Sequence, residues 1–586
     1  MAIFYYVNED NHLILISLLK QYGIRKIIAS PGGTNITFVG SVQNDPFFQI
    51  YSCIDERSAA YMACGMAEET GEPVIISCTG ATSSRNYMPA LTEAYYRKLP
   101  IVAITSSQDN SRVGHLVAQV TDRSSPPSDV ANISVHLQTV KDSTDKWDCM
   151  IKVNKALHTL TKNGGGPVHI NLVSTYSKEY TIKELPKTRK IGYYTSFDKF
   201  PTFTLKRVAI FVGAHHVWSK KLIESVDLFC SKHNAVVLCD HTSNYNGKYK
   251  VMSALAGLQA CVQTPLLKID LLIHIGEISG AYDAFCFKPK EVWRVNEDGE
   301  IRDQFRTLTN VFHMTEEHFF EIYNQKDATD ESDSQLIDWT AYNLQLHAAL
   351  PEMPFCNIWI AQQLADKVPA NSVLYLGILN SLRSWSYFEV PKSVRVYSNT
   401  GGFGIDGIVS TMVGSSIASP NILHFAVLGD LSFFYDLNIL GNRQLGNNVR
   451  ILVINNGKGI EFRLINHNGY IFGDDCDKYI AAGGHNGNCS PYVLKSFSES
   501  LGFKYLTAST KEQFKEVYKD FINPKQCSTP IVFEVFTETE NETKTLKEVG
   551  QIVKNYRFIS KKKTVGIIKK IIGEKKTKLL RDMLLK

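Results

Sequence analysis

Short apolar runs recur along the first third of the chain, and each one ends in small or polar residues. Four runs have the length and β-branched composition of buried strands: residues 27–29, 48–53, 74–78 and 101–105. Between them, residues 8–22 and 86–96 carry apolar side chains at helical spacing. Strands that alternate with helices in this way predict an α/β domain built on a parallel sheet.

The same alternation returns in two later stretches. Strand-like runs occur at residues 208–213, 235–238 and 271–276, and again at 374–377, 426–429 and 451–454. A chain of 586 residues is also too long for a single core. We therefore predict an α/β fold of three consecutive doubly wound domains with parallel sheets, at residues 1–180, 181–335 and 336–550, followed by a basic tail at 551–586.

Candidate chemistry is concentrated at two of the predicted strand ends. Asp430 directly follows the run 426–429, and Asn456 follows the run 451–454 after one further asparagine. They are 26 positions apart, which leaves room for one crossover helix, so both side chains can lie at the same edge of a sheet. A carboxylate and an amide oxygen suit Mg²⁺, which keeps its other positions for phosphate oxygens. The two residues alone fit an ordinary βαβ unit with polar turns equally well.

Composition narrows the class of protein. Hydrophobic residues make up 44% and charged residues 21% of the chain, which is ordinary for a soluble globular protein. The 12 cysteines form no CxxC pair. Because no signal peptide or membrane-spanning run is recognisable, we expect reduced thiols and a cytoplasmic location.

The small net charge of +5 is concentrated at the C-terminus. Lysines interleaved with Ile and Leu from Asn555 onward predict an amphipathic helix. Such a helix could make weak contact with an anionic membrane surface or an acidic partner. A solvated tail fits the same composition. No nucleic-acid-binding motif is present, and we expect no nucleic-acid partner.

The segment around Asp430 carries a family resemblance. Two short segments, Gly429-Asp430-Leu431-Ser432 and Asn455-Asn456 further along the chain, together resemble the thiamine-diphosphate motif of the acetolactate synthase/pyruvate decarboxylase superfamily. The longer string from Gly429 to Asn438 is most similar to the menaquinone-pathway branch, the 2-succinyl-5-enolpyruvyl-6-hydroxy-3-cyclohexene-1-carboxylate synthases. The resemblance extends over about residues 10 to 540. It implies that the three domains are a pyrimidine-binding, a central and a diphosphate-binding domain.

The resemblance also implies a set of cofactor residues. Asp430 and Asn456 would hold Mg²⁺ through their side chains and Lys458 through its backbone carbonyl. Glu56, at a predicted strand end, would hydrogen-bond the aminopyrimidine ring of thiamine diphosphate and so have a catalytic role. Ile405 would support the bent form of the cofactor. The remaining positions expected near the cofactor are Gly33, Gly402, Gly404, Gly429, Leu431, Ser432, Gly459 and Ile460.

Substrate residues are where the chain departs from that family. Gln119 matches a catalytic, substrate-contacting glutamine, and Arg383 matches one substrate-site arginine of the family. Three other arginine positions of the family are held by Thr34, Gln108 and Thr400. Since arginines bind carboxylates bidentately, their loss argues against isochorismate as the acceptor. Thr34, Gln108 and Thr400 suit a neutral, hydroxyl-rich acceptor. The one remaining arginine, Arg383, suits the single carboxylate of a pyruvate-sized donor.

The predicted activity is thiamine-diphosphate- and Mg²⁺-dependent decarboxylation of a 2-oxo acid, with transfer of the acyl anion to an acceptor carbonyl. The alternative is a simple decarboxylase that releases an aldehyde. A third reading is a binding or regulatory relic of the fold, but a relic has no need to keep Glu56, Asp430 and Asn456 together. By resemblance we expect a homodimer or homotetramer with active sites between subunits.

Overall fold

The computed structural model describes residues 5–123, 125–202, 207–259, 265–465, 467–485 and 490–555. The chain forms two compact units. The first consists of Met1–Phe197 with Gly299–Val311, and the second of Asp198–Asp298 with Phe312–Lys586. The predicted basic tail lies almost entirely outside the described residues. Within the described part of the chain, no helix has both the length and the apolar character needed to span a membrane.

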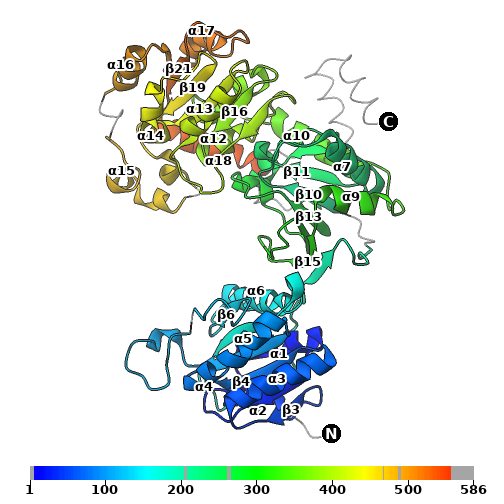
Figure 1. Cartoon of the computed structure of the whole chain (residues 1–586). Helices are drawn as coiled ribbons and strands as arrows, with labels where there is room; N and C mark the ends of the chain where they lie inside the picture. Colours follow the sequence, from blue (N-terminus) through cyan, green and yellow to red (C-terminus); the bar gives the residue numbers. More distant parts are fainter. Residues whose placement is uncertain are drawn as a thin grey trace. The chain divides into compact units, whose positions relative to one another are not determined.

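The first unit contains a six-stranded parallel sheet (Figure 1). Its strands are β2 (Lys26–Ala29), β3 (Gln49–Ser52), β4 (Val74–Thr79), β5 (Ile101–Ser107), β6 (Ser134–Leu137) and β7 (Val168–Val173), in the order β3-β2-β4-β5-β7-β6. The helices are α1 (Asp10–Tyr22), α2 (Ile36–Val42), α3 (Glu56–Thr70), α4 (Thr82–Asn86), α5 (Met88–Arg97) and α6 (Ser143–Thr159). A separate antiparallel pair joins β1 (Tyr6–Val7) to β8 (Tyr180–Ile182).

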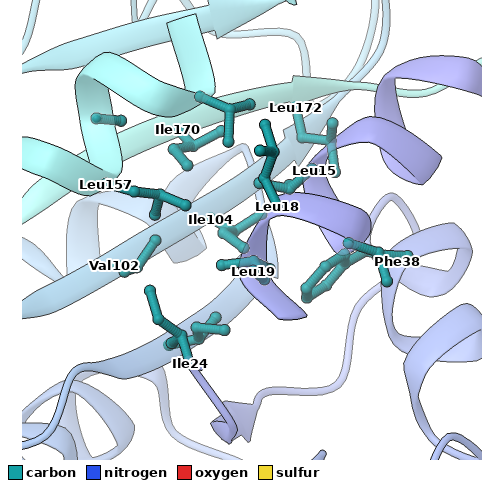
Figure 2. Packing of buried hydrophobic residues seen from close by; sticks show 14 of the residues in the cluster. Leu15, Leu18, Leu19, Ile24, Phe38, Val102, Ile104, Leu157, Ile170 and Leu172 are labelled. Atoms are coloured by element: carbon teal, nitrogen blue, oxygen red, sulfur yellow. The ribbon is translucent and has the colours of Figure 1, made fainter. Parts of the chain in front are cut away.

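Both faces of this sheet are buried. On β5, Val102 and Ile104 belong to a core with α1 and α6, whereas Ile101 and Ala103 belong to a core with α3 and α5. Figure 2 shows the first of these cores, where leucines of α1 pack on Ile104 and its neighbours. Burial on both faces explains why the strands read as continuous apolar runs rather than as alternating ones.

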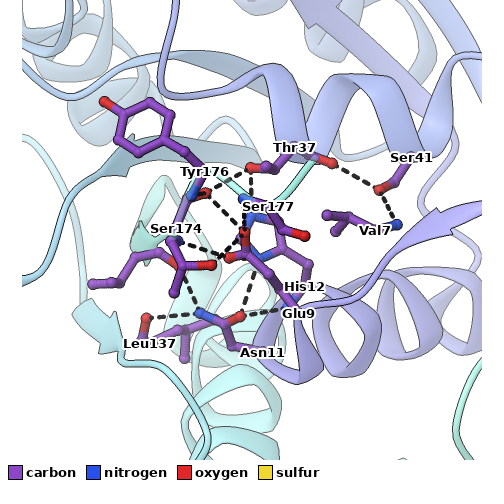
Figure 3. Close-up of polar contacts among 12 residues, drawn as sticks. Val7, Glu9, Asn11, His12, Thr37, Ser41, Leu137, Ser174, Tyr176 and Ser177 are labelled. Atoms are coloured by element: carbon purple, nitrogen blue, oxygen red, sulfur yellow. Dashed lines mark hydrogen bonds and ion pairs between the residues drawn. The ribbon is translucent and has the colours of Figure 1, made fainter. Parts of the chain in front are cut away.

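A buried polar cluster ties the start of α1 to the end of β7 (Figure 3). The Glu9 carboxylate accepts hydrogen bonds from the Ser174 hydroxyl and the Ser177 backbone N–H, both at 3.1 Å. His12 lies between Glu9, 3.4 Å from its Nδ1, and the Thr37 hydroxyl, 3.0 Å from its Nε2. Burial lowers the pKa of His12 to about 4, so the ring is neutral in the folded protein at neutral pH.

The second unit contains two further parallel arrays (Figure 1). In the first, the order is β12-β11-β10-β13-β14, formed by β10 (Val208–Val212), β11 (Val236–Cys239), β12 (Lys250–Met252), β13 (Leu271–Ile275) and β14 (Glu291–Asn296). Its helices are α7 (Lys220–His233), α8 (Ala254–Leu258) and α9 (Glu316–Asn324). Strands β9 (Gly192–Thr195) and β15 (Leu308–His313) lie where the chain passes between the units.

The last sheet has the order β17-β16-β18-β19-β21-β20. It is formed by β16 (Val373–Leu376), β17 (Arg395–Tyr397), β18 (His424–Gly429), β19 (Val449–Asn455), β20 (Lys504–Ala508) and β21 (Ile531–Phe536). The accompanying helices are α10 (Ser334–Ala348), α11 (Asn357–Leu364), α12 (Asn380–Trp385), α13 (Ile408–Ala418), α14 (Asp430–Tyr435), α15 (Asp475–Tyr479), α16 (Val493–Ser500), α17 (Lys511–Phe521), α18 (Thr539–Val549) and α19 (Ile552–Asn555).

The first and last sheets have the same topology. Numbered along the chain, their strands follow the order 2-1-3-4-6-5 in both cases. The order reverses between β2 and β4 in one sheet and between β16 and β18 in the other, and such switch points are where open α/β sheets bind ligands. The α/β class and the three parallel sheets agree with the sequence prediction. The domain boundaries drawn at residues 180, 335 and 550 stay predictions.

Candidate active site

Asp430 and Asn456 lie at the same edge of the last sheet. Strands β18 and β19 are parallel neighbours, and Gly429 is in register with Ile454. Asp430 is the first residue of α14 and is 1% exposed, and Asn456 directly follows β19. The Asn456 Oδ1 is shielded from solvent and has no hydrogen-bond partner among the described residues. A buried amide oxygen left unpaired is costly, and a bound cation would satisfy it.

The turn that carries Asn456 is fixed by its neighbours. Gly457 has φ +83°, which glycine adopts without strain, and its N–H donates to Asn455 Oδ1 at 3.1 Å. The Lys458 ammonium donates to Asp477, which also accepts from Arg463. The Lys458 side chain is thus engaged within the protein, and the metal contact predicted for Lys458 involves its backbone carbonyl.

Gly459 and Ile460 continue this turn. The Gly459 N–H donates to Ala481 O at 2.6 Å, and Ile460 is 6% exposed. The backbone hydrogen bond of Gly459 and the burial of Ile460 therefore fix the chain directly after the predicted metal residue Lys458.

The glycine-rich loop before α13 is tied to α14. The Ser432 hydroxyl donates to the Ile405 carbonyl at 2.5 Å, and Ile405 itself is half-buried. Gly402 has open space around its α-carbon, whereas a Cβ at Gly404 would lie 2.2 Å from the Asp406 carboxylate. Leu431 is half-buried beside Asp430. The predicted cofactor residues of this unit therefore follow the carboxyl ends of β17, β18 and β19.

Glu56 stands at a strand end of the first unit. It is the first residue of α3, four positions after Ser52, the last residue of β3. The capping residue Asp55 accepts from the N–H groups of Arg57 and Ser58. The half-buried Glu56 carboxylate accepts from the Asn86 side chain at 3.2 Å. The helix cap leaves Glu56 itself able to hydrogen-bond a ligand.

The turn after β2 brings Gly33 to the surface of the same unit. Gly33 is exposed, with no atom within 4 Å of a Cβ built on it. Gly32 is crowded, because a Cβ there would lie 2.2 Å from the Thr79 hydroxyl. Thr34 is 2% exposed, and its hydroxyl donates to Ser106 O at 2.6 Å. The hydroxyl hydrogen of Thr34 is thus bound to a backbone carbonyl of β5.

Gln119 lies on the segment between β5 and β6. It is exposed and has φ +63°, and the exposed Leu116 has φ +58°. Non-glycine residues rarely adopt this conformation, and they cluster at functional sites when they do. No sequence pattern marked this backbone strain.

Arg383, on α12, has a partner that the sequence did not predict. Its guanidinium donates to both carboxylate oxygens of Glu461, at 2.8 and 2.6 Å. Asp283 lies 3.9 Å from the Arg383 Nε and accepts from the Tyr387 hydroxyl at 2.8 Å. Burial lowers the pKa of Arg383, but the hydrogen bonds and charge of Glu461 outweigh it and hold that pKa above its usual value.

The predicted site residues fall into two sets. The first unit holds the Glu56 set, which is Glu56, Gly33, Thr34 and Gln119. The second unit holds the Asp430 set, which comprises the residues from Gly429 to Ser432, those from Asn456 to Ile460, the glycine-rich loop and Arg383. Within each unit the members of a set stand at carboxyl ends of parallel strands or on the segments that follow them. Their roles toward cofactor and substrate stay predictions.

Comparison with known proteins supports the cofactor. Residues 12–125 match the family model described as "Thiamine pyrophosphate enzyme, N-terminal TPP binding domain". A protein of Bacteroides thetaiotaomicron is 30% identical over 93% of this chain and 98% of its own length. Proteins of Bacteroides fragilis and Christiangramia forsetii are 29% and 26% identical, over 94% and 92% of this chain and 100% and 98% of their own lengths. All three carry the name 2-succinyl-5-enolpyruvyl-6-hydroxy-3-cyclohexene-1-carboxylate synthase. The chain therefore belongs to this synthase family and is a thiamine-diphosphate-dependent enzyme.

Proposed function

We propose that the chain decarboxylates a 2-oxo acid with the help of Mg²⁺ and transfers the acyl group to an acceptor carbonyl that carries few carboxylates. The observation that carries the metal site is the buried Oδ1 of Asn456, which has no hydrogen-bond partner in the part of the chain that the structure describes, together with the buried Asp430 on the neighbouring strand end. Hard oxygen donors in this combination suit Mg²⁺ bound to a diphosphate.

Each group of residues has a defined task in this proposal. Bound thiamine diphosphate supplies the electron sink for decarboxylation. Asp430, Asn456 and the Lys458 carbonyl hold the metal and, through it, the diphosphate. The Glu56 carboxylate holds a proton at the pyrimidine ring, and Gln119 orients the substrate carbonyl. Gly33 and Gly402 leave the space in which backbone groups approach the ligand.

The acceptor follows from how the four substrate positions are engaged. Thr34 donates to Ser106, and Gln108 accepts from Arg112. Thr400 is 5% exposed, with its methyl group packed at Gly280. Arg383 is bound to Glu461. None of these four positions offers an unengaged guanidinium, so a neutral, hydroxyl-rich acceptor and a pyruvate-sized donor fit best.

A second candidate is the reaction in the relatives' name, formation of 2-succinyl-5-enolpyruvyl-6-hydroxy-3-cyclohexene-1-carboxylate. It is favoured by identity that extends over almost the full length of both chains.

One screen separates the candidates. Protein loaded with thiamine diphosphate and Mg²⁺ is given a panel of 2-oxo acids, alone and with aldehydes, ketones or isochorismate, and CO₂ and products are measured. Ligated products from neutral acceptors support the proposal. Efficient turnover of isochorismate with 2-oxoglutarate favours the second candidate. Aldehyde release alone identifies a simple decarboxylase, and no CO₂ from any acid refutes the function.

We also propose that the active enzyme is a homodimer or homotetramer, with the cofactor between the Glu56 set of one subunit and the Asp430 set of another. The basis is the family resemblance together with the division of the predicted cofactor residues into two sets. A cytoplasmic location stays part of the same proposal.

A further inference from the structure

Arg383 and Glu461 form a closed pair at the edge of the last sheet. Arg383 lies on α12, after β16, and Glu461 lies on the turn after β19. The two side chains are 15% and 16% exposed. The two-point contact, at 2.8 and 2.6 Å, is the geometry with which a guanidinium binds a carboxylate ligand. Glu461 thus engages both terminal nitrogens of the Arg383 guanidinium.

A second carboxyl group of the protein lies near the same guanidinium. Asp283 already lies 3.9 Å from the Arg383 Nε, so one guanidinium faces two carboxyl groups. Burial raises the pKa of Asp283, which the charge of Arg383 opposes. The described contacts of Asp283 include a hydrogen bond from Tyr387 at 2.8 Å, which holds it in place. A third carboxylate at Arg383 would face like charges in a buried site.

The partner of Arg383 comes from the same turn as the predicted metal residues. Glu461 follows Asn456 by five positions, and the turn is also fastened by the contacts of Arg463 and Lys458 to Asp477. Glu461 can therefore be neutralised while this second ion-pair group still anchors the turn. This permits a test that separates occupancy of Arg383 from simple loosening of the turn.

We propose that Glu461 is a specificity-determining residue that occupies Arg383 and thereby excludes substrates with a second carboxylate. The inference rests on the proposed function, because it assumes that Arg383 borders the substrate site. It narrows the substrates to 2-oxo acids and acceptors whose distal groups are neutral.

The test is Glu461→Gln, which keeps the shape of the side chain but removes its charge. Binding of glutarate, an unreactive dicarboxylate, is measured by calorimetry on protein loaded with thiamine diphosphate and Mg²⁺. We expect at least tenfold tighter glutarate binding than in the wild type, and a lower KM for 2-oxoglutarate relative to pyruvate. The double variant Glu461→Gln/Arg383→Met should lose the gain, because the released guanidinium is then absent.

Asp477→Asn is the matched control, because it weakens the other ion-pair group of the same turn. Equal glutarate binding by folded Glu461→Gln and wild type would overturn the inference, and so would an equal gain in Asp477→Asn. If Glu461→Gln does not fold, Glu461→Ala serves the same comparison. Absence of decarboxylation by every variant would refute the proposed function, while the glutarate titration would still decide the role of Glu461.

Discussion

Asn455 and Glu534 are joined by a buried hydrogen bond, in which the Asn455 Nδ2 donates to the Glu534 Oε1 at 2.7 Å. The two residues are 5% and 1% exposed. The Tyr505 hydroxyl donates to the other Glu534 oxygen, also at 2.7 Å. Burial raises the pKa of Glu534, which these two hydrogen bonds oppose. Because Asn455 in turn accepts from the Gly457 N–H, strand β21 holds the turn that carries Asn456.

Glu534→Ala should weaken both stability and Mg²⁺ binding. The change leaves the buried Asn455 amide without its acceptor, at about 1–3 kcal/mol, and also removes the acceptor of the part-buried Tyr505 hydroxyl. Glu534→Gln keeps an oxygen for Asn455 and should stay within about 1 kcal/mol of the wild type. Denaturant unfolding and Mg²⁺ titration in the presence of thiamine diphosphate measure the two effects. Equal losses in both variants would argue against positioning through Asn455.

Binding of thiamine diphosphate should require a divalent cation and should fail in Asp430→Ala. The reason is that the Asp430 carboxylate and the Asn456 oxygen would otherwise face the diphosphate without a metal between them. Calorimetric titration with the cofactor, with and without EDTA, measures this. Asp474→Ala, at a carboxylate that is 99% exposed, is the control and should bind normally. Unchanged affinity in EDTA would contradict the metal assignment.

Glu56→Gln should keep the fold but lose most activity. Glutamine can still accept from Asn86, so stability should change little, but an amide cannot hold and release the proton as a carboxyl group does. Turnover and the exchange rate of the thiazolium C2 proton, followed by NMR, are the measurements. Near-wild-type values of both would refute the catalytic role.

The first unit should lose stability as the pH falls below neutral. His12 is fully buried, and its pKa of about 4 is below the value of roughly 6.5 expected in the unfolded chain. The unfolded chain therefore binds more protons below pH ~6.5. The contribution of His12 to stability is fully present above that pH and is lost progressively toward pH 4, by at most about 3 kcal/mol. The dependence of the unfolding free energy on pH across this range should become weaker in His12→Gln, while other histidines of the same unit whose pKa values burial also lowers, His158 and His169 among them, keep the remainder. His115→Gln, at an exposed ring, is the control.

In solution the protein should have at least twice the mass of one chain. Light scattering at working concentration measures this. Mixing Glu56→Gln with Asp430→Ala protein should restore part of the activity. In a mixed dimer, one of the two sites combines the intact Glu56 of one subunit with the intact Asp430 of the other. A fully active monomer would contradict the shared site.

The strand ends and their motif residues could be predicted because they are encoded locally. Asp430 and Asn456 each follow an apolar run, and the parallel order of β18 and β19 brings the two ends together. The partners of the site residues could not be predicted in the same way. Glu461 is 78 positions from Arg383, and Glu534 is 79 positions from Asn455. No periodicity or local spacing links residues so far apart, since their pairing is set by packing of the finished sheet.

The hydrogen bond of Thr34 is another contact that the sequence does not predict. The Thr34 hydroxyl donates to Ser106 O, 72 positions away, and its predicted contact with substrate stays a prediction. A threonine in a turn gives no sign in the sequence of whether it points to a ligand or to the next strand.

The 2-1-3-4-6-5 strand order has a consequence for how the protein is made. The fifth strand of each sheet, β6 or β20, pairs only with the sixth, β7 or β21, within the described sheets. During synthesis the fifth strand therefore emerges before its partner exists, and the fourth strand keeps an open edge until the sixth arrives. If synthesis ends before Ile531, β19 keeps one unpaired edge and β20 has no partner in the sheet, and unpaired edges of this kind favour association with other chains.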